Sequence, residues 1–111
     1  MATTTFTGPV VSRNGFIAGS GATVSTILAG SASLNFPSIS AASQADLTIT
    51  VTGAAAGSPV ILGLPASPTA GIVFNAFVSA TNTVTVRATN VTASPVDPAA
   101  ATYNVVVLVA A

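Results

Sequence analysis

Strict alternation of threonine with aliphatic residues is the feature that most constrains what this chain can fold into. Residues 47–52 read Leu-Thr-Ile-Thr-Val-Thr, and residues 83–89 read Thr-Val-Thr-Val-Arg-Ala-Thr. Successive side chains of a β-strand point to opposite faces, so each segment has one apolar face and one face lined mainly by hydroxyls. An apolar strand face must be covered by another layer. The alternation therefore predicts half-buried strands packed in two sheets.

Turn-forming residues divide most of the chain into segments of strand length. Glycine and proline recur between residues 53 and 71, and no segment repeats apolar residues with helical spacing. The short connection at 80–82 predicts an antiparallel hairpin between the strands on either side. Beyond residues 47–52, strands are expected at 23–28, 33–36, 59–64, 72–79, 83–90 and 102–109. We therefore expect an all-β fold, a small antiparallel β-sandwich (jelly-roll-like or immunoglobulin-like) with an extended N-terminal arm.

The last expected strand is apolar on both faces. One face carries Tyr103, Val105, Val107 and Val109. The other face carries Val106 and Leu108. Strands with two apolar faces are typical of positions where both faces are covered. This strand is therefore expected either to lie centrally between covered faces or to present Val106 and Leu108 to a neighbouring subunit.

Residues 1–43 differ in composition from residues 44–111, so we expect an N-terminal arm and linker followed by the β-sandwich domain. The first part is rich in Thr, Ser, Gly and Ala, with apolar residues scattered singly. Asn14-Gly15 between two short apolar pairs predicts a hairpin or tight turn over residues 10–17. Isolated apolar anchors fold poorly alone but order against a partner. The candidate partner-binding residues of the arm are Phe6, Pro9, Val10, Phe16 and Ile17.

The chain has very few side chains of the types that carry out catalysis. The 111 residues include no His, Cys, Lys or Glu, and the charged residues are Arg13, Arg87, Asp46 and Asp97. Proton transfer, nucleophile activation and metal ligation draw largely on the missing residue types. We therefore expect no enzyme, cofactor, metal site or small-molecule substrate. Two arginines far apart in the sequence cannot neutralise a run of phosphates, so we expect no nucleic-acid partner either.

Composition favours association. The formal net charge is zero and the mean hydropathy is +0.82, which predicts a subunit with much of its surface covered. The uncharged stretch 47–86 is interrupted by Gly and Pro and offers no run of about 20 apolar residues, so no membrane span is expected. The sequence starts without a basic region followed by an apolar one, so folding in the cytoplasm is expected.

The roles of the charged residues stay open at this level. Asp46 precedes a strand and Asp97 lies between two prolines, where each could cap a turn or form a surface ion pair. Arg87 lies on a hydroxyl-lined face and is either solvated or in contact with a carboxylate or carbonyl, within or between subunits. It is included among the candidate partner-binding residues, together with Val106 and Leu108.

Three segments carry a resemblance to a known class of proteins. They are Phe6-Thr-Gly-Pro-Val-Val-Ser-Arg-Asn-Gly-Phe16, Asp46-Leu-Thr-Ile-Thr-Val-Thr-Gly53 and Val78-Ser-Ala-Thr-Asn-Thr-Val-Thr-Val-Arg-Ala-Thr-Asn90. The chain resembles small structural proteins of tailed bacteriophages, found as head decoration (cement) proteins or as head-fibre domains. The resemblance implies a homotrimeric β-sandwich on the outer capsid surface of the virion. It also implies that the arm binds the major capsid protein and that the head is stabilised.

Two other functions remain open on the sequence. The chain could be a head-fibre or adhesin module that binds a host-surface glycan, or a self-assembling fibre or surface-layer subunit unrelated to phage. Glycan-binding tips usually expose aromatic side chains for stacking on sugar, whereas this chain has a single Tyr and no Trp. The composition therefore favours the decoration protein over the adhesin.

Overall fold

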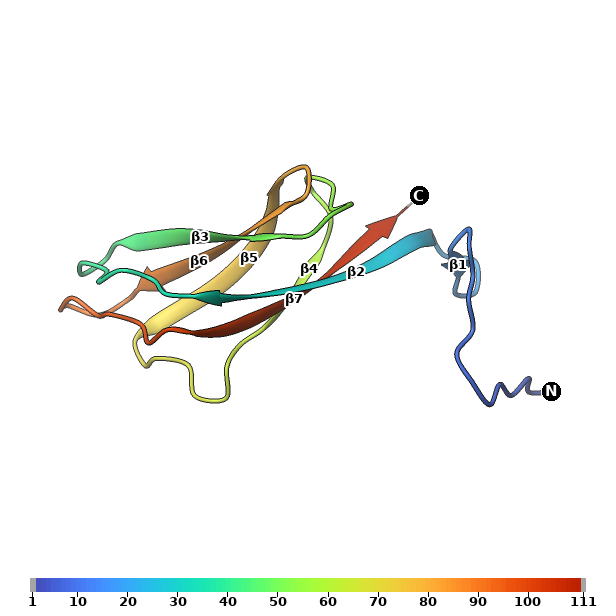
Figure 1. Ribbon diagram of the computed structural model, residues 1–111, viewed down its shortest axis with the longest axis horizontal. Helices are drawn as coiled ribbons and strands as arrows, with labels where there is room; N and C mark the ends of the chain where they lie inside the picture. The colour runs from blue at the N-terminus through green and yellow to red at the C-terminus, as the bar shows by residue number, and fades with distance from the viewer. Residues whose placement is uncertain (1, 111) are drawn as a thin grey trace.

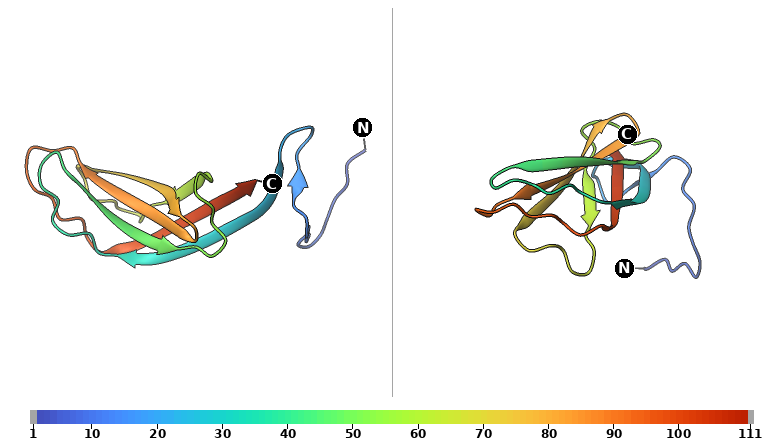
Figure 2. Two further views of the ribbon diagram at one scale, coloured as in Figure 1. Left: turned by 90° about the horizontal axis from the view of Figure 1, so that it is seen from above. Right: turned by 60° about the vertical axis from the view of Figure 1, so that its left-hand side comes forward.

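A computed structural model describes residues 2–110 as two packed β-sheets, with no helix among those residues. Seven strands follow one another along the chain: β1 (Phe16–Ile17), β2 (Thr23–Leu34), β3 (Gln44–Thr50), β4 (Val60–Gly63), β5 (Ile72–Ala80), β6 (Thr83–Asn90) and β7 (Ala101–Ala110). The four-stranded sheet has the order β1-β2-β7-β4 and the three-stranded sheet the order β3-β6-β5. Every pairing is antiparallel. The predicted antiparallel β-sandwich is confirmed (Figures 1 and 2).

The aliphatic residues that alternate with threonine form the inner face of the three-stranded sheet, as predicted. Ile49 pairs with Val84, and these two side chains are 2% and 0% exposed. On the next strand, β5 pairs with β6 to form the predicted hairpin, whose turn contains Asn82 at φ 64°. The Asn82 side chain accepts a hydrogen bond of 2.8 Å from the backbone N–H of Gly53. The hairpin turn is thereby tied to the end of the neighbouring strand β3.

Aliphatic side chains from both sheets form the core, together with three aromatic rings. Phe36, Phe74 and Tyr103 have ring centroids 5.4–6.0 Å apart, in tilted or edge-to-face contact. Such pairs add to the stabilisation that burial of the rings provides. The three rings come from the segment after β2, from β5 and from β7, so they join the two sheets. The buried apolar residues are Leu34, Phe36, Ile39, Ile49, Val51, Ala54, Val78, Val84, Val86, Ala88, Tyr103, Val105 and Val107.

The boundary between arm and sandwich lies earlier in the chain than the sequence predicted, because strand β2 belongs to the sandwich. The sequence placed that boundary at residue 43 and expected separate strands at 23–28 and 33–36, but β2 runs unbroken and pairs with β7 from Val24 to Leu34. Its alternation is weak because small residues fill its middle. A Cβ on Gly30 would lie 2.8 Å from the Cγ2 atom of Val51, closer than packed atoms approach. The close packing of the two sheets therefore needs glycine there, and the separate arm ends before Thr23.

The turn predicted at Asn14-Gly15 is present, but the predicted hairpin over residues 10–17 is not. Gly15 has φ +83°, and the Ser12 hydroxyl donates a hydrogen bond to its carbonyl. Phe16 and Ile17 pair with β2 instead of with the segment that precedes the turn. A Cβ on Gly15 would collide with the carbonyl oxygen of Val24, so the absence of a side chain allows β1 to lie against β2. Strand β1 therefore forms a hairpin with β2, the strand that follows it.

The arm projects beyond one end of the sandwich, beside the end of β7 (Figures 1 and 2). The radius of gyration is 17.5 Å and the longest dimension 58 Å. A compact chain of this length has a radius of gyration of about 13 Å. The difference reflects an arm that packs little against its own sandwich.

Candidate functional site

Part of the outer face of the four-stranded sheet is aliphatic and only partly buried. Tyr103, Val105 and Val107 point into the core, so the alternate residues of β7 point outward. The neighbouring strands contribute side chains to the same outer surface, with Ile27 on β2 56% exposed and Ile61 on β4 60% exposed. We call this surface the aliphatic face; it consists of Ile27, Ala29, Ile61, Val106 and Leu108.

The strand register makes the aliphatic face continuous. Ile61 on β4 pairs with Val106 on β7, and Val106 pairs with Ala29 on β2. Ile27 pairs with Leu108 in the adjacent outward row. Side chains paired in this way across antiparallel strands contact one another. Strand β7 thus lies centrally in its sheet, but the predicted alternative of two covered faces holds only for its inner face, since Val106 and Leu108 are only partly buried by this chain.

A shallow hollow of about 300 Å³ interrupts this surface. It exists because β2 carries small residues where it passes over the core. The protruding side chain of Ile61 stands on the other side of β7, on β4. The hollow is lined by Ala29, Gly30, Ser31, Asn104, Val105 and Val106. The face therefore has a knob along one edge and a depression along the other.

The opposite outer surface, on the three-stranded sheet, carries an ion pair and threonine hydroxyls together with the exposed Val73. Arg87 on β6 and Asp46 on β3 are paired in the register and joined by two hydrogen bonds of 2.9 Å each. The guanidinium carbon also lies 5.0 Å from the centroid of the Phe77 ring, a cation–π distance. The hydrogen bond with Arg87 lowers the pKa of Asp46 and raises that of Arg87. Asp46 thus forms a surface ion pair, and Arg87, predicted to contact a partner, is engaged within its own chain.

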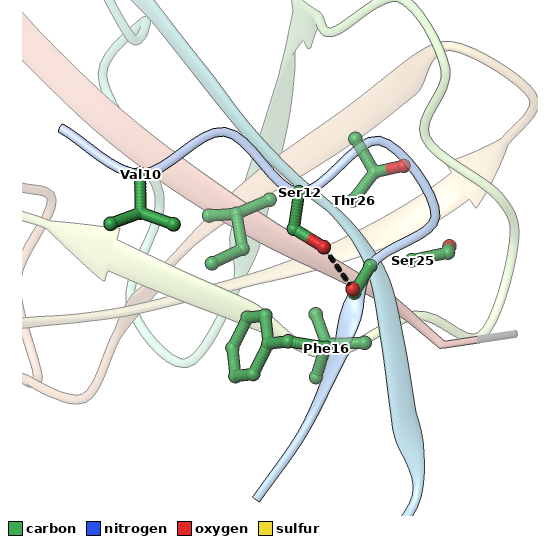
Figure 3. Close-up of a pocket in the computed structure, with 8 residues that line it drawn as sticks. Val10, Ser12, Phe16, Ser25 and Thr26 are labelled. Carbon is green, nitrogen blue, oxygen red and sulfur yellow. Dashed lines mark hydrogen bonds between the residues drawn. The ribbon is translucent and has the colours of Figure 1, made fainter. Parts of the chain in front are cut away.

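The candidate residues of the arm are exposed. Phe6, Val10, Phe16 and Ile17 are 51–68% exposed, and Pro9 is exposed as well. Val10 and Phe16 line a depression of about 200 Å³ together with Ile27, at the end of the aliphatic face nearest the arm (Figure 3). Ser12, Ser25 and Thr26 supply its polar wall. The arm and the aliphatic face therefore meet at this depression.

Asn90, at the end of β6, is a buried polar residue whose structural role the sequence analysis missed. Its side-chain N–H groups donate to the carbonyls of Ile39 and Ser94, and its side-chain oxygen accepts from the N–H and hydroxyl of Thr92, all at 2.7–2.9 Å. Asn90 thereby ties three segments together at one end of the sandwich. Because the amide is fully buried, the Asn-Val-Thr sequence there is closed to glycosylation in the folded chain. The only signal in the sequence was its place at the end of an alternating strand.

Within residues 2–110 we find no cluster of three or more His, Cys, Asp or Glu side chains. Asp97 is exposed in the segment between β6 and β7. Burial raises the pKa of the Tyr103 phenol, which lies in the core rather than in a cleft. The same residues include no helix long and apolar enough to span a membrane. The conspicuous features of the described chain are therefore two apolar surfaces, the aliphatic face and the arm.

Comparison with models of protein families, with curated proteins and with solved structures finds no match to this chain.

Proposed function

We propose that this chain is a structural subunit of a phage head, a decoration (cement) protein that binds the outer capsid surface as a homotrimer and stabilises the shell. The observation that carries the proposal is the presence of two exposed apolar surfaces, the arm and the aliphatic face, on one small chain. The aliphatic face serves contact between copies, and the arm serves contact with the major capsid protein. The resemblance of residues 6–16, 46–53 and 78–90 to phage head proteins supplies the identity of the shell.

The total surface area supports a subunit that is covered in an assembly. The chain exposes 6894 Å². A folded monomer of 10.7 kDa exposes about 5,500 Å², so the excess is about 1,400 Å². A standard protein–protein interface buries about 800 Å² on each partner. The excess is of the size that contacts with more than one neighbour remove.

The arm has the features of a segment that orders against a partner. Its large apolar side chains are separated by Ser, Thr and Gly and pack little against the sandwich. Many copies bound to one shell gain avidity from repeated weak contacts, and such binding needs no reaction. A role in stabilisation of a shell therefore fits a chain with so few reactive side chains.

Binding to heads tests the proposal directly. Full-length chain is mixed with undecorated heads of the phage that encodes it and sedimented, and the bound copies per head are counted. We expect near-saturating occupancy for the unaltered chain and at least a tenfold loss of affinity for Phe6→Asp/Val10→Asp. Val91→Asp is the matched control, because Val91 is 63% exposed but lies far along the chain from the arm. Full occupancy by the arm variant would contradict the arm assignment, and no binding by the unaltered chain would contradict the function.

A further inference from the structure

We propose that the aliphatic face closes a ring of identical chains, with Ile61 of each copy seated in the hollow beside Ala29 and Ser31 of the next copy. The inference deepens the proposed function, on which it rests, by naming the surface and the mode of contact between copies. The occupant of the face is therefore a second copy of this chain.

The positions of the knob and the hollow allow Ile61 of one copy to enter the hollow of another. Ile61 lies on β4, on one side of the central strand β7, and the hollow lies over β2 and β7 on the other side. A contact that joins two different patches repeats from copy to copy and closes into a ring when the rotation allows. A two-fold contact can also seat each Ile61 in the hollow of the other copy, so the trimer of the proposed function is what selects the ring. The relief of the face thus fits a cyclic arrangement.

The small area of the face makes a single contact between two copies weak. Strands lie about 4.8 Å apart and rise about 3.4 Å per residue, so five residues each of β2 and β7 and the four of β4 present roughly 230 Å² in projection. The projected area is less than half of the roughly 800 Å² per partner of a standard interface, so one pairwise contact is weak. Ring closure gives every chain two contacts instead of one.

The chemistry of the face suits contact with its own copies. None of the four charged residues belongs to it, so identical chains meet without repulsion between like charges or burial of an ion. The polar residues that line the hollow are Ser31 and Asn104. A primary amide both donates and accepts hydrogen bonds, so Asn104 can bond to the same residue of another copy near the axis.

Engineered cysteines test the contact cleanly because the natural chain has no cysteine. Ile61→Cys and Ser31→Cys are prepared as full-length single variants, mixed, and oxidised with oxidised glutathione. Within one chain, β7 separates the strands that carry the two positions. Two strand spacings, about 10 Å, exceed the roughly 7 Å limit for a disulfide between Cα atoms. Every disulfide formed is therefore between chains.

We expect the mixed variants to cross-link at least tenfold more than either variant alone, and the double variant Ile61→Cys/Ser31→Cys to give a closed covalent trimer. Thr48→Cys is the control, because Thr48 is exposed on β3 of the three-stranded sheet, and this variant should stay monomeric on a denaturing gel. Preferential cross-linking of Ile61→Cys with itself, or a double variant that stops at a covalent dimer, would overturn the ring. A trimer by mass without cross-links would overturn this use of the face but leave the proposed function standing. A chain that stays monomeric and fails to bind heads would overturn the proposed function itself.

Discussion

Asp46 and Arg87 lie opposite each other on β3 and β6 and form a two-point ion pair, with both hydrogen bonds at 2.9 Å. The pair places half of the chain's charged side chains on the outer face of the three-stranded sheet. The outer face of the four-stranded sheet carries none. This division of charge makes the two surfaces of the sandwich chemically different. It leaves the aliphatic face as the surface that gains most from being covered.

Replacement of Ile61 by aspartate is expected to dissociate the oligomer without unfolding the chain. The substitution places a charge at a position where we propose that an aliphatic side chain is buried against another copy. Sedimentation velocity should show monomers for Ile61→Asp at concentrations that give oligomers of the unaltered chain. Val73→Asp is a close control, since Val73 is 55% exposed and lies on the opposite sheet. Equal dissociation by both variants would show that the effect comes from general charge rather than from the face.

Replacement of Asn90 by alanine is expected to destabilise the fold by about 3 kcal/mol. The change removes four hydrogen bonds of a buried amide, each worth about 0.5–1.5 kcal/mol, and leaves the Thr92 N–H without a partner. Urea denaturation followed by circular dichroism measures the difference. Asn75→Ala, on the exposed face of β5, should change stability by less than about 0.5 kcal/mol. A loss of the same size at both positions would mean that Asn90 does not tie the segments together.

Addition of one methyl group at Gly30 is expected to destabilise the chain by about 1–3 kcal/mol, since it overpacks the contact between the sheets. The cost should shrink in a Val51→Ala background, because the atom that blocks the new Cβ belongs to Val51. Denaturant midpoints of the four chains in this double-mutant cycle measure the coupling. Gly8→Ala is the control, with nothing within 4 Å of its Cβ position. Additive effects of the two core changes would contradict the close packing.

The stability of the fold is expected to be nearly constant from pH 5 to pH 9 and to fall in strong alkali. The chain has no His, Cys or Glu, so no side chain of a type that titrates near neutrality is present. Burial raises the pKa of Tyr103 above the 10.0 of a free phenol. The folded chain therefore holds this proton to a higher pH than the unfolded chain, and stability falls as the pH rises above about 10. Thermal melts across this range check the profile, and Tyr103→Phe should flatten the alkaline limb. A transition near pH 6 would contradict it.

The sequence predicted those parts of the fold that rest on local pattern. Alternation in β3 and β6 and the short turn at Asn82 identified two neighbouring strands, whose pairing is regular along its whole length, and the hairpin of β5 and β6. The middle of β2 was misread because Gly30 is required by the approach of Val51, a contact distant in sequence, and the small residues on either side of it are exposed. The pairing of Asp46 with Arg87 depends on a strand register that local pattern does not specify. Ile27 and Ile61 were missed as surface residues for the same reason, although Val106 and Leu108 on the central strand were found.

The proposed association of copies through the aliphatic face is tested most simply by the mass of the chain in solution. Sedimentation equilibrium of the purified, full-length chain is measured from micromolar to millimolar concentration. We expect the mass to rise reversibly with concentration to three times the 10.7 kDa of one chain. Ile61→Asp should abolish this rise, and Val73→Asp should preserve it. A monomer at every concentration, with the aliphatic face left in water, would contradict the proposed association.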